Sequence, residues 1–307
     1  MDRGIDGLIR TVNVLDHVGL SHDGSYKTCE QEKHPFVANV KDTRIAIIPF
    51  TYGTNFNSHR KKLPNDEYVN LLNADTALKY PPKKKNGLRR KIMKLLRKPF
   101  KIERIVALKK MLGMTYNVPR QDNYLDEKSV KPYFQKLKSI MDEAKQKADL
   151  ILFYPHIGGQ FNVQPGRFTE YTVSKALEYG ADAIVASHPH IVQKAEYKEN
   201  KPCFYSIGNF SMSPNSVYLL HENLPEYGLA AHLYIENKEI VKTTFSILKI
   251  VEKKNEMLTV FPLDLLFDEL SNQEDKEKLL TEARRIYSAV TGVQPSEPII
   301  RREYELC

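Results

Sequence analysis

The sequence predicts a layered α/β fold, and three observations carry this prediction. Apolar, β-rich runs alternate with helical periodicity between residues 129 and 186, which is typical of strands that pair in parallel. From residue 191 the pattern changes to short strands with turn signals, which indicates an antiparallel second sheet or a mixed edge on the first. Helical periodicity near each end of the chain predicts one further helix there.

The first predicted elements are a helix and a buried strand. Over residues 4–19 apolar side chains recur at helical spacing, at Ile5, Leu8, Val12 and Leu15. Residues 44–50 (RIAIIPF) predict a strand that ends in the turn Tyr52-Gly53-Thr54-Asn55. Residues 58–124 break this rhythm with prolines and a lysine run, and we interpret them as an insertion with basic helices.

The later elements follow one another closely. We expect a helix that ends at Ala148 and a strand at 149–154, then a helix at 168–179 and a strand at 182–186. Short strands are expected next, at 191–197, 202–207, 229–236, 239–253 and 256–262. A helix near 272–291 is signalled by a capping box of Ser271 with Glu274 and by Gly292 at its end.

Composition excludes several classes of protein. Of the 307 residues 41% are hydrophobic and 27% charged, which argues against a disordered or fibrous chain. No apolar run approaches the roughly 18–20 residues that cross a bilayer, and the first ten residues lack the features of a secretory signal. The cysteines Cys29, Cys203 and Cys307 lie far apart, which disfavours a disulfide framework or a zinc ribbon.

The net charge of +8 comes from one segment. Residues 83–110 contain thirteen Lys or Arg and one acid, so they carry +12 and leave the rest of the chain at −4. Basic side chains that include Arg89, Arg90, Lys91 and Lys94 flank an apolar stripe, which fits a helix on anionic lipid or on an anionic polymer. A plain solvated insertion stays open, and nucleic acid is disfavoured because only Phe100 is aromatic there.

Two predicted core strands end in loops that carry histidine. His156 follows the strand at 149–154, while His188 and His190 follow the strand at 182–186. Ligands of open α/β sheets bind at the carboxyl ends of strands. Pro189 favours an extended segment, on which the two histidines would project to the same side. Three converging imidazoles would form an incomplete metal shell, and a turn whose histidines only cap strand ends is the alternative.

Another strand ends in Gly208-Asn209. Glycine permits a tight turn or a close approach of backbone, and asparagine can contact an oxyanion or a metal. A plain turn at the end of a strand is the alternative.

These motifs together resemble the CapA family, bacterial capsule-synthesis (poly-γ-glutamate) proteins with a calcineurin-like metallophosphatase fold. The resemblance rests on DLILFYPHIGGQF, GADAIVASHPHIVQKAEY and KPCFYSIGNFSMSP, in that order, with RIAIIPFTYGTN upstream. It covers roughly residues 1–57 and 125–215. It implies a metallophosphatase-like β-sandwich flanked by helices, within a single domain 1–307 that includes the insertion 58–124 and a C-terminal helix and tail, 268–307.

The resemblance also implies roles for particular residues. His156, His188 and His190 match the family's histidines that face divalent cations, with Mn, Fe, Zn or Mg as the candidate metals. Asn209 and Asp2 match positions that line the substrate side of the site. Metals in such sites activate water and polarise a phosphoryl oxygen, so the implied reaction is the hydrolysis of a phosphoester or a related bond.

The chain departs from the family pattern at its start. The family's Gly-Asp strand, Asn-x-Glu loop and Asn-Asn-His motif lie upstream of the position that Asp2 matches. We therefore expect an N-terminally truncated member that lacks carboxylate ligands and leaves the apolar edges of residues 44–50 and of their neighbours uncovered. A compact protein that folds without those strands is the alternative. The motifs support metal binding and do not by themselves support catalysis.

Two functional hypotheses follow. The leading one is a CapA-like protein of capsule or cell-envelope polymer biosynthesis, whose partners are an anionic polymer or phosphorylated precursor and other capsule-synthesis proteins. The rival is a non-enzymatic member that binds an anionic polymer or a membrane surface through residues 83–110. The resemblance implies a place at the cell envelope, in association with the membrane.

Overall fold

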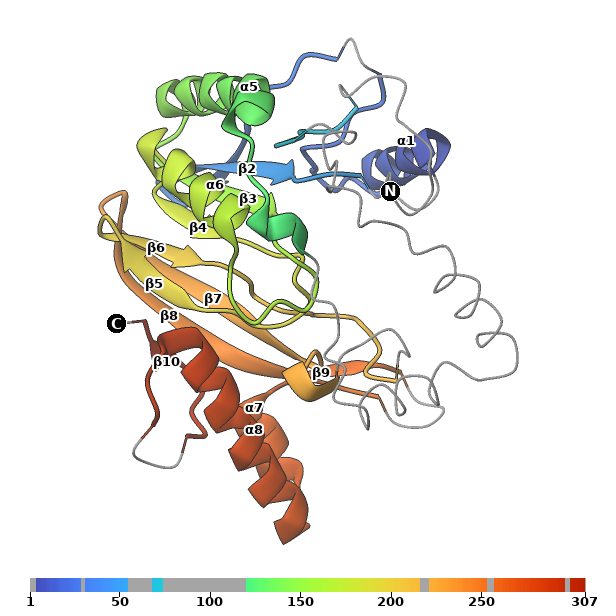
Figure 1. The fold of residues 1–307 in the computed structure, drawn as a ribbon, viewed down its shortest axis with the longest axis vertical. Helices are drawn as coiled ribbons and strands as arrows, with labels where there is room; N and C mark the ends of the chain where they lie inside the picture. Colours follow the sequence, from blue (N-terminus) through green and yellow to red (C-terminus); the bar gives the residue numbers. More distant parts are fainter. Residues whose placement is uncertain are drawn as a thin grey trace, which may run out of the picture.

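The computed structural model describes residues 4–28, 31–54, 68–73, 120–215, 221–252, 257–295 and 299–306. Two β-sheets form the centre of the molecule, with α5 (Glu127–Lys147) and α6 (Arg167–Glu178) on one side and α7 (Leu263–Glu269) and α8 (Gln273–Thr291) on the other (Figure 1). A further helix, α1 (Gly4–His17), lies near the N-terminus. In the described part of the chain, no helix combines the length and the hydropathy needed to span a bilayer.

The first sheet has six strands in the order β1-β2-β3-β4-β6-β5. Its strands are β1 (Phe36–Val40), β2 (Thr43–Thr51), β3 (Leu150–His156), β4 (Ala183–Val185), β5 (Ala195–Lys198) and β6 (Lys201–Phe204). Strands β2, β3, β4 and β6 pair in parallel, while β1 and β5 close the two edges in antiparallel pairing. The predicted alternation of strands and helices is confirmed.

One face of this sheet packs on α5 and α6. Side chains of a strand alternate between its two faces, so Ala46, Ile48 and Phe50 of β2 all point toward the helices and are at most 2% exposed. Phe134 and Met141 of α5 meet them in the same core. Asp126 caps α5 by accepting a hydrogen bond from the backbone N–H of Lys128.

The second sheet is antiparallel. It consists of β7 (Tyr227–Glu236), β8 (Glu239–Val251), β9 (Thr259–Pro262) and β10 (Tyr304–Glu305). A second core joins its residues Leu229 and Phe245 to Leu279 of α8 and to Val185 and Phe204 of the first sheet. Both sequence alternatives for the chain after residue 191 are therefore realised, because β5 and β6 extend the first sheet and β7, β8 and β9 belong to the second.

The expectation of uncovered strand edges is wrong for residues 44–50. Both edges of β2 are paired, one with β1 and the other with β3. Strand β1 was not predicted; it turns back onto β2 through Lys41, which lies in the left-handed region at φ 55°. Two smaller corrections concern the C-terminal helices: α7 was not predicted, and the N-cap of α8 is Asn272 rather than Ser271.

Part of the predicted insertion belongs to the core. Residues 68–73 run beside the end of β2, where the N–H of Thr51 donates to the carbonyl of Asn70 at 2.8 Å. Leu71 and Leu72 are 1% and 0% exposed. The chain re-enters the described fold through the short 3₁₀ helix η1 (Arg120–Asn123). The basic residues Arg89, Arg90, Lys91 and Lys94 lie outside the described residues.

Candidate functional site

The histidine loops meet because their strands are neighbours. β3 and β4 pair in parallel with Leu152 opposite Ala183, so their carboxyl ends lie at the same edge of the sheet. His156 is the last residue of β3 and forms a β-bridge with Ser187, just after β4. We call His156, His188 and His190 the histidine cluster.

The imidazole ring of His188 lies close to the rings of both His156 and His190. The ring centroids of His156 and His188 are 4.5 Å apart, and those of His188 and His190 are 5.8 Å apart. Tyr52, from the turn after β2, stacks on His156 at 6.4 Å and lies 4.7 Å from His188. Tyr52 was not predicted as a site residue, although its position after a neighbouring parallel strand was a sufficient signal.

The backbone of the His-Pro-His segment is not extended, so that expectation is wrong. His188 has φ 113° and His190 has φ 60°, both in the left-handed region that costs a side-chain-bearing residue about 1–3 kcal/mol. Packing of Pro189 explains the difference: its ring closes on Gly158, where a Cβ would lie 2.8 Å from Cγ of Pro189. The carbonyl of Pro189 also accepts from the N–H of Phe161 at 2.7 Å.

Electrostatics keep two of the rings neutral. Burial, followed by the neighbouring imidazole His156, lowers the pKa of His188 to about 2. Burial and then His190 lower the pKa of His156 to about 4, even though part of that side chain remains exposed. Neutral imidazoles have a lone pair on one ring nitrogen, so both side chains can act as ligands near neutral pH.

Asn209 is tied to His190 from the opposite loop. Its Nδ2 donates to the carbonyl oxygens of His190 at 3.0 Å and Pro225 at 2.8 Å, and its Oδ1 lies 2.9 Å from Nδ1 of His190. Gly208 makes this placement possible, because a Cβ there would lie 2.5 Å from the carbonyl oxygen of Tyr227. The predicted close approach of backbone at Gly208 is therefore confirmed.

A buried carboxylate supports the loop that follows His156. Asp122 is 2% exposed and accepts hydrogen bonds from the backbone N–H groups of Gly166 and Thr169 and from Oγ1 of Thr169. It thereby caps the N-terminus of α6 from another part of the chain. Burial raises the pKa of Asp122 despite these bonds. No local sequence pattern points to Asp122, since its partners lie more than forty residues away.

The described residues do not by themselves form a metal site. Both ring nitrogens of His188 are buried and make no hydrogen bond to a described residue, an arrangement that a bound ligand would relieve. Yet no three His, Cys, Asp or Glu side chains of the described segments are grouped so that they could hold an ion. Asp2 lies outside these segments. The metal-binding roles of His156, His188 and His190 stay a prediction, and we derive no reaction step through a metal.

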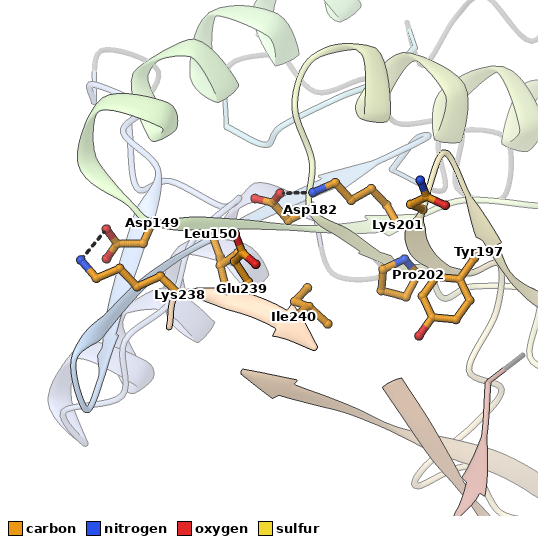
Figure 2. Close-up of a pocket in the computed structure, with 10 residues that line it drawn as sticks. Asp149, Leu150, Asp182, Tyr197, Lys201, Pro202, Lys238, Glu239 and Ile240 are labelled. Carbon is orange, nitrogen blue, oxygen red and sulfur yellow. Dashed lines mark hydrogen bonds and ion pairs between the residues drawn. The ribbon is translucent and has the colours of Figure 1, made fainter. Parts of the chain in front are cut away.

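A separate cavity of about 460 Å³ opens at the opposite edge of the first sheet (Figure 2). Two ion pairs border it: Asp149 with Lys238 at 3.2 Å, and Asp182 with Lys201 at 2.7 Å. Asp149 is bound by Arg44 as well, at 3.0 Å. The charges of the two aspartates that line this cavity, Asp149 and Asp182, are thus balanced by lysine and arginine side chains of the protein itself.

Comparison with known proteins identifies the family to which the chain belongs. A family model described as "Bacterial capsule synthesis protein PGA_cap" matches residues 1–213. An uncharacterised protein of Sinorhizobium fredii, y4sH, is 25% identical over 216 residues, which is 68% of this chain and 46% of that protein. The capsule biosynthesis protein CapA of Bacillus anthracis is 32% identical over 76 residues, 25% of this chain and 18% of that protein. The chain thus spans less than half the length of these curated relatives.

Solved structures give a weaker likeness. A putative 5′-nucleotidase from Staphylococcus aureus, solved in complex with alpha-ketoglutarate, matches with a TM-score of 0.30 and 12% identity, over 86% of this chain and 37% of that one. A TM-score at this level carries no argument about function.

Proposed function

Because the chain belongs to the family of bacterial capsule synthesis proteins, PGA_cap, we propose that it acts in the biosynthesis of a capsule or cell-envelope polymer of the poly-γ-glutamate type, with the histidine cluster as its functional centre. The family membership supports the resemblance to CapA proteins that the sequence motifs gave. The activity, the substrate and the partners of the whole protein are part of the proposal.

One observation carries the choice of this centre. His188 holds both ring nitrogens in a buried position without a hydrogen-bond partner among the described residues, 4.5 Å from the ring of His156. Burying polar atoms without partners costs free energy, so such an arrangement is expected where a ligand takes up the lone pair. The ring of Tyr52 lies beside the same pair of rings.

Although the described side chains do not by themselves form a group that could hold an ion, the ligand that we propose is a divalent metal ion, Mn, Fe, Zn or Mg. His156, His188 and His190 would be among its donors, with further donors from outside the described residues. Such an ion would polarise a phosphoryl oxygen and activate water when bound. The chemical partner would then be a phosphorylated precursor of the anionic polymer. The chain's own contribution includes two imidazoles, those of His156 and His188, that stay uncharged because burial lowers their pKa values.

Metal content tests the proposal. The purified chain would be dialysed against Mn²⁺, Zn²⁺ or Fe²⁺ and its bound metal measured by mass spectrometry. We expect stoichiometric metal in the wild type and at least tenfold less in the triple variant His156→Ala, His188→Ala and His190→Ala, because the proposed donors are removed.

A matched variant controls for the loss of three histidines. His17, His34 and His232 lie on α1, before β1 and on β7, away from the cluster, and replacing all three by alanine should leave the bound metal unchanged. Equal metal content in the two triple variants, or a wild type without metal, would contradict the proposal.

A second candidate function rests on charge. Residues 83–110 carry +12 against −4 for the rest of the chain, which favours a non-enzymatic role in holding an anionic polymer or a membrane surface. A metal-free chain that binds a polyanion in a salt-sensitive manner would favour this candidate over the first.

A further inference from the structure

The side-chain amide of Asn209 has a fixed orientation. Its Nδ2 faces two carbonyl oxygens, that of His190 at 3.0 Å and that of Pro225 at 2.8 Å. Carbonyl oxygens only accept hydrogen bonds, so the amide NH₂ group must point toward them and cannot exchange places with the oxygen. Oδ1 of Asn209 is therefore the atom that faces Nδ1 of His190, at 2.9 Å.

This orientation decides the tautomer of His190. An amide oxygen cannot donate, so Nδ1 of His190 must carry the proton in their shared hydrogen bond. A neutral imidazole has one N–H, and Nε2 of His190 is then left with its lone pair. Nε2 makes no hydrogen bond to a described residue.

Asn209 also restrains the backbone of the same histidine. His190 lies in the left-handed region at φ 60°, which a side-chain-bearing residue adopts only when its surroundings hold it there. The bond from Nδ2 of Asn209 to the carbonyl of His190 is one such restraint. Asn209 is only 9% exposed, so its polar atoms are committed to this loop rather than to the open side of the site.

We propose that Asn209 is a positioning residue that holds His190 as the Nδ1–H tautomer and presents Nε2 as the nitrogen that binds the ligand of the histidine cluster. The proposal rests on the proposed function only in assigning His190 to that cluster. It replaces the expected contact between Asn209 and the substrate with an indirect role through His190. Partners that orient a ligating histidine typically change metal affinity 10–100-fold when they are removed.

The tautomer can be read directly by NMR. The ring nitrogens of ¹⁵N-labelled, chelator-treated protein would be observed by long-range ¹H–¹⁵N correlation, at a pH where His190 is neutral. We expect a protonated Nδ1 and a bare Nε2 in the wild type. In Asn209→Ala the Nε2–H form should become populated, since the accepting oxygen is lost.

Two further variants separate positioning from folding. Asn209→Asp keeps an accepting oxygen and should retain the Nδ1–H form, even though it loses the two bonds to carbonyl groups. Asn215→Ala removes an exposed asparagine that is bonded to Glu252 and should leave the His190 signals unchanged. A wild type that carries the proton on Nε2, or an Asn209→Ala variant with the wild-type pattern, would overturn the proposal. Should Asn209→Ala fail to fold, the wild-type and Asn209→Asp spectra still decide it.

Metal titration gives an independent second readout. We expect Asn209→Ala to bind Zn²⁺ or Mn²⁺ about tenfold more weakly than the wild type and Asn209→Asp to recover most of this loss. An unchanged affinity in Asn209→Ala would count against the role of Nε2. The NMR measurement is made without metal, so a chain that binds no metal but shows the predicted tautomer would contradict the proposed function alone.

Discussion

Gly208 illustrates how a single residue can position the site. Its φ of +72° lies in the left-handed region, and a Cβ on it would lie 2.5 Å from the carbonyl oxygen of Tyr227 and 3.1 Å from Cα of Gly228. Gly292, at the end of α8, has the same φ of +72°, but a Cβ on it would meet no atom within 4 Å. An alanine at Gly292 would therefore bear only the free-energy cost of the left-handed backbone, whereas an alanine at Gly208 would bear that cost and also the cost of the clash with β7.

We expect Gly292→Ala to lower the free energy of unfolding by about 1 kcal/mol, through the left-handed conformation alone. Gly208→Ala should cost about 1–3 kcal/mol more, because β7 must move away from the added methyl group. Urea unfolding of both variants measures the difference. Equal losses in the two variants would show that the contact with Tyr227 relaxes freely.

At the scale of elements, α8 is attached to the second sheet by a buried charge network. Oε2 of Glu282 accepts from Nζ of Lys249 and from the hydroxyl of Tyr227, both at 2.6 Å. The Lys249 side chain is 18% exposed and that of Glu282 is 11% exposed. Burial alone would raise the pKa of Glu282, but the bonds from Lys249 and Tyr227 outweigh it and hold this pKa below its usual value.

This network predicts a pH dependence of stability. A carboxyl group with a lowered pKa in the folded state stabilises the fold above its unfolded pKa, about 4.3 for glutamate, and loses that contribution as the pH falls further. Glu282→Gln should therefore be less stable than the wild type at pH 7, by about 3 kcal/mol because Lys249 is left unpaired. The difference in the free energy of unfolding between Glu282→Gln and the wild type should become smaller as the pH is lowered toward 3, because Glu282 of the wild type then becomes protonated.

Urea unfolding at pH 7, 5 and 3 measures this effect, with Glu277→Gln as the control. Glu277 is exposed on the same helix, and its side chain accepts a hydrogen bond from Nε2 of Gln273, so its replacement should change stability by less than about 0.5 kcal/mol at each pH. A difference for Glu282→Gln that does not vary with pH would contradict the assignment.

At the scale of the whole molecule, charge is distributed unevenly along the chain. The segment 83–110 carries +12, while the remainder carries −4. Its basic side chains lie outside the described residues, so their role stays a prediction from the sequence. Exposed charge contacts weaken as ionic strength rises, which gives this role a clear signature.

We expect the chain to bind poly-L-glutamate at low salt and to lose affinity as salt is raised. A variant with glutamine at Arg89, Arg90, Lys91 and Lys94 should bind at least tenfold more weakly, because four cationic contacts are removed. The control carries glutamine at four exposed lysines of α5, Lys128, Lys131, Lys138 and Lys147, and should bind as the wild type does. Equal losses in both variants would indicate an unspecific charge effect, and comparably tight binding of RNA would favour nucleic acid instead.

Prediction from the sequence succeeded where a local pattern is strong. The apolar run at 44–50 and the strand before His156 were found because buried parallel strands are continuous hydrophobic runs. β1 and α7 were missed, since five and seven residues are too few for a clear period. Asp122 was missed for a different reason, because it belongs to the site only through partners distant in the chain. Tyr52 could have been found, since it directly follows a predicted strand that lies beside β3.

The sequence by itself determined the α/β class, the family and the three histidines at the ends of neighbouring strands, because periodicity and motif spacing are local properties of the chain. Only the tertiary structure decided the left-handed backbone of His188 and His190, the pairing of both edges of β2, and the orientation of the Asn209 amide. Each of these depends on atoms from separate segments, among them Gly158, Phe36 and Pro225, that come together only when the sheets pack.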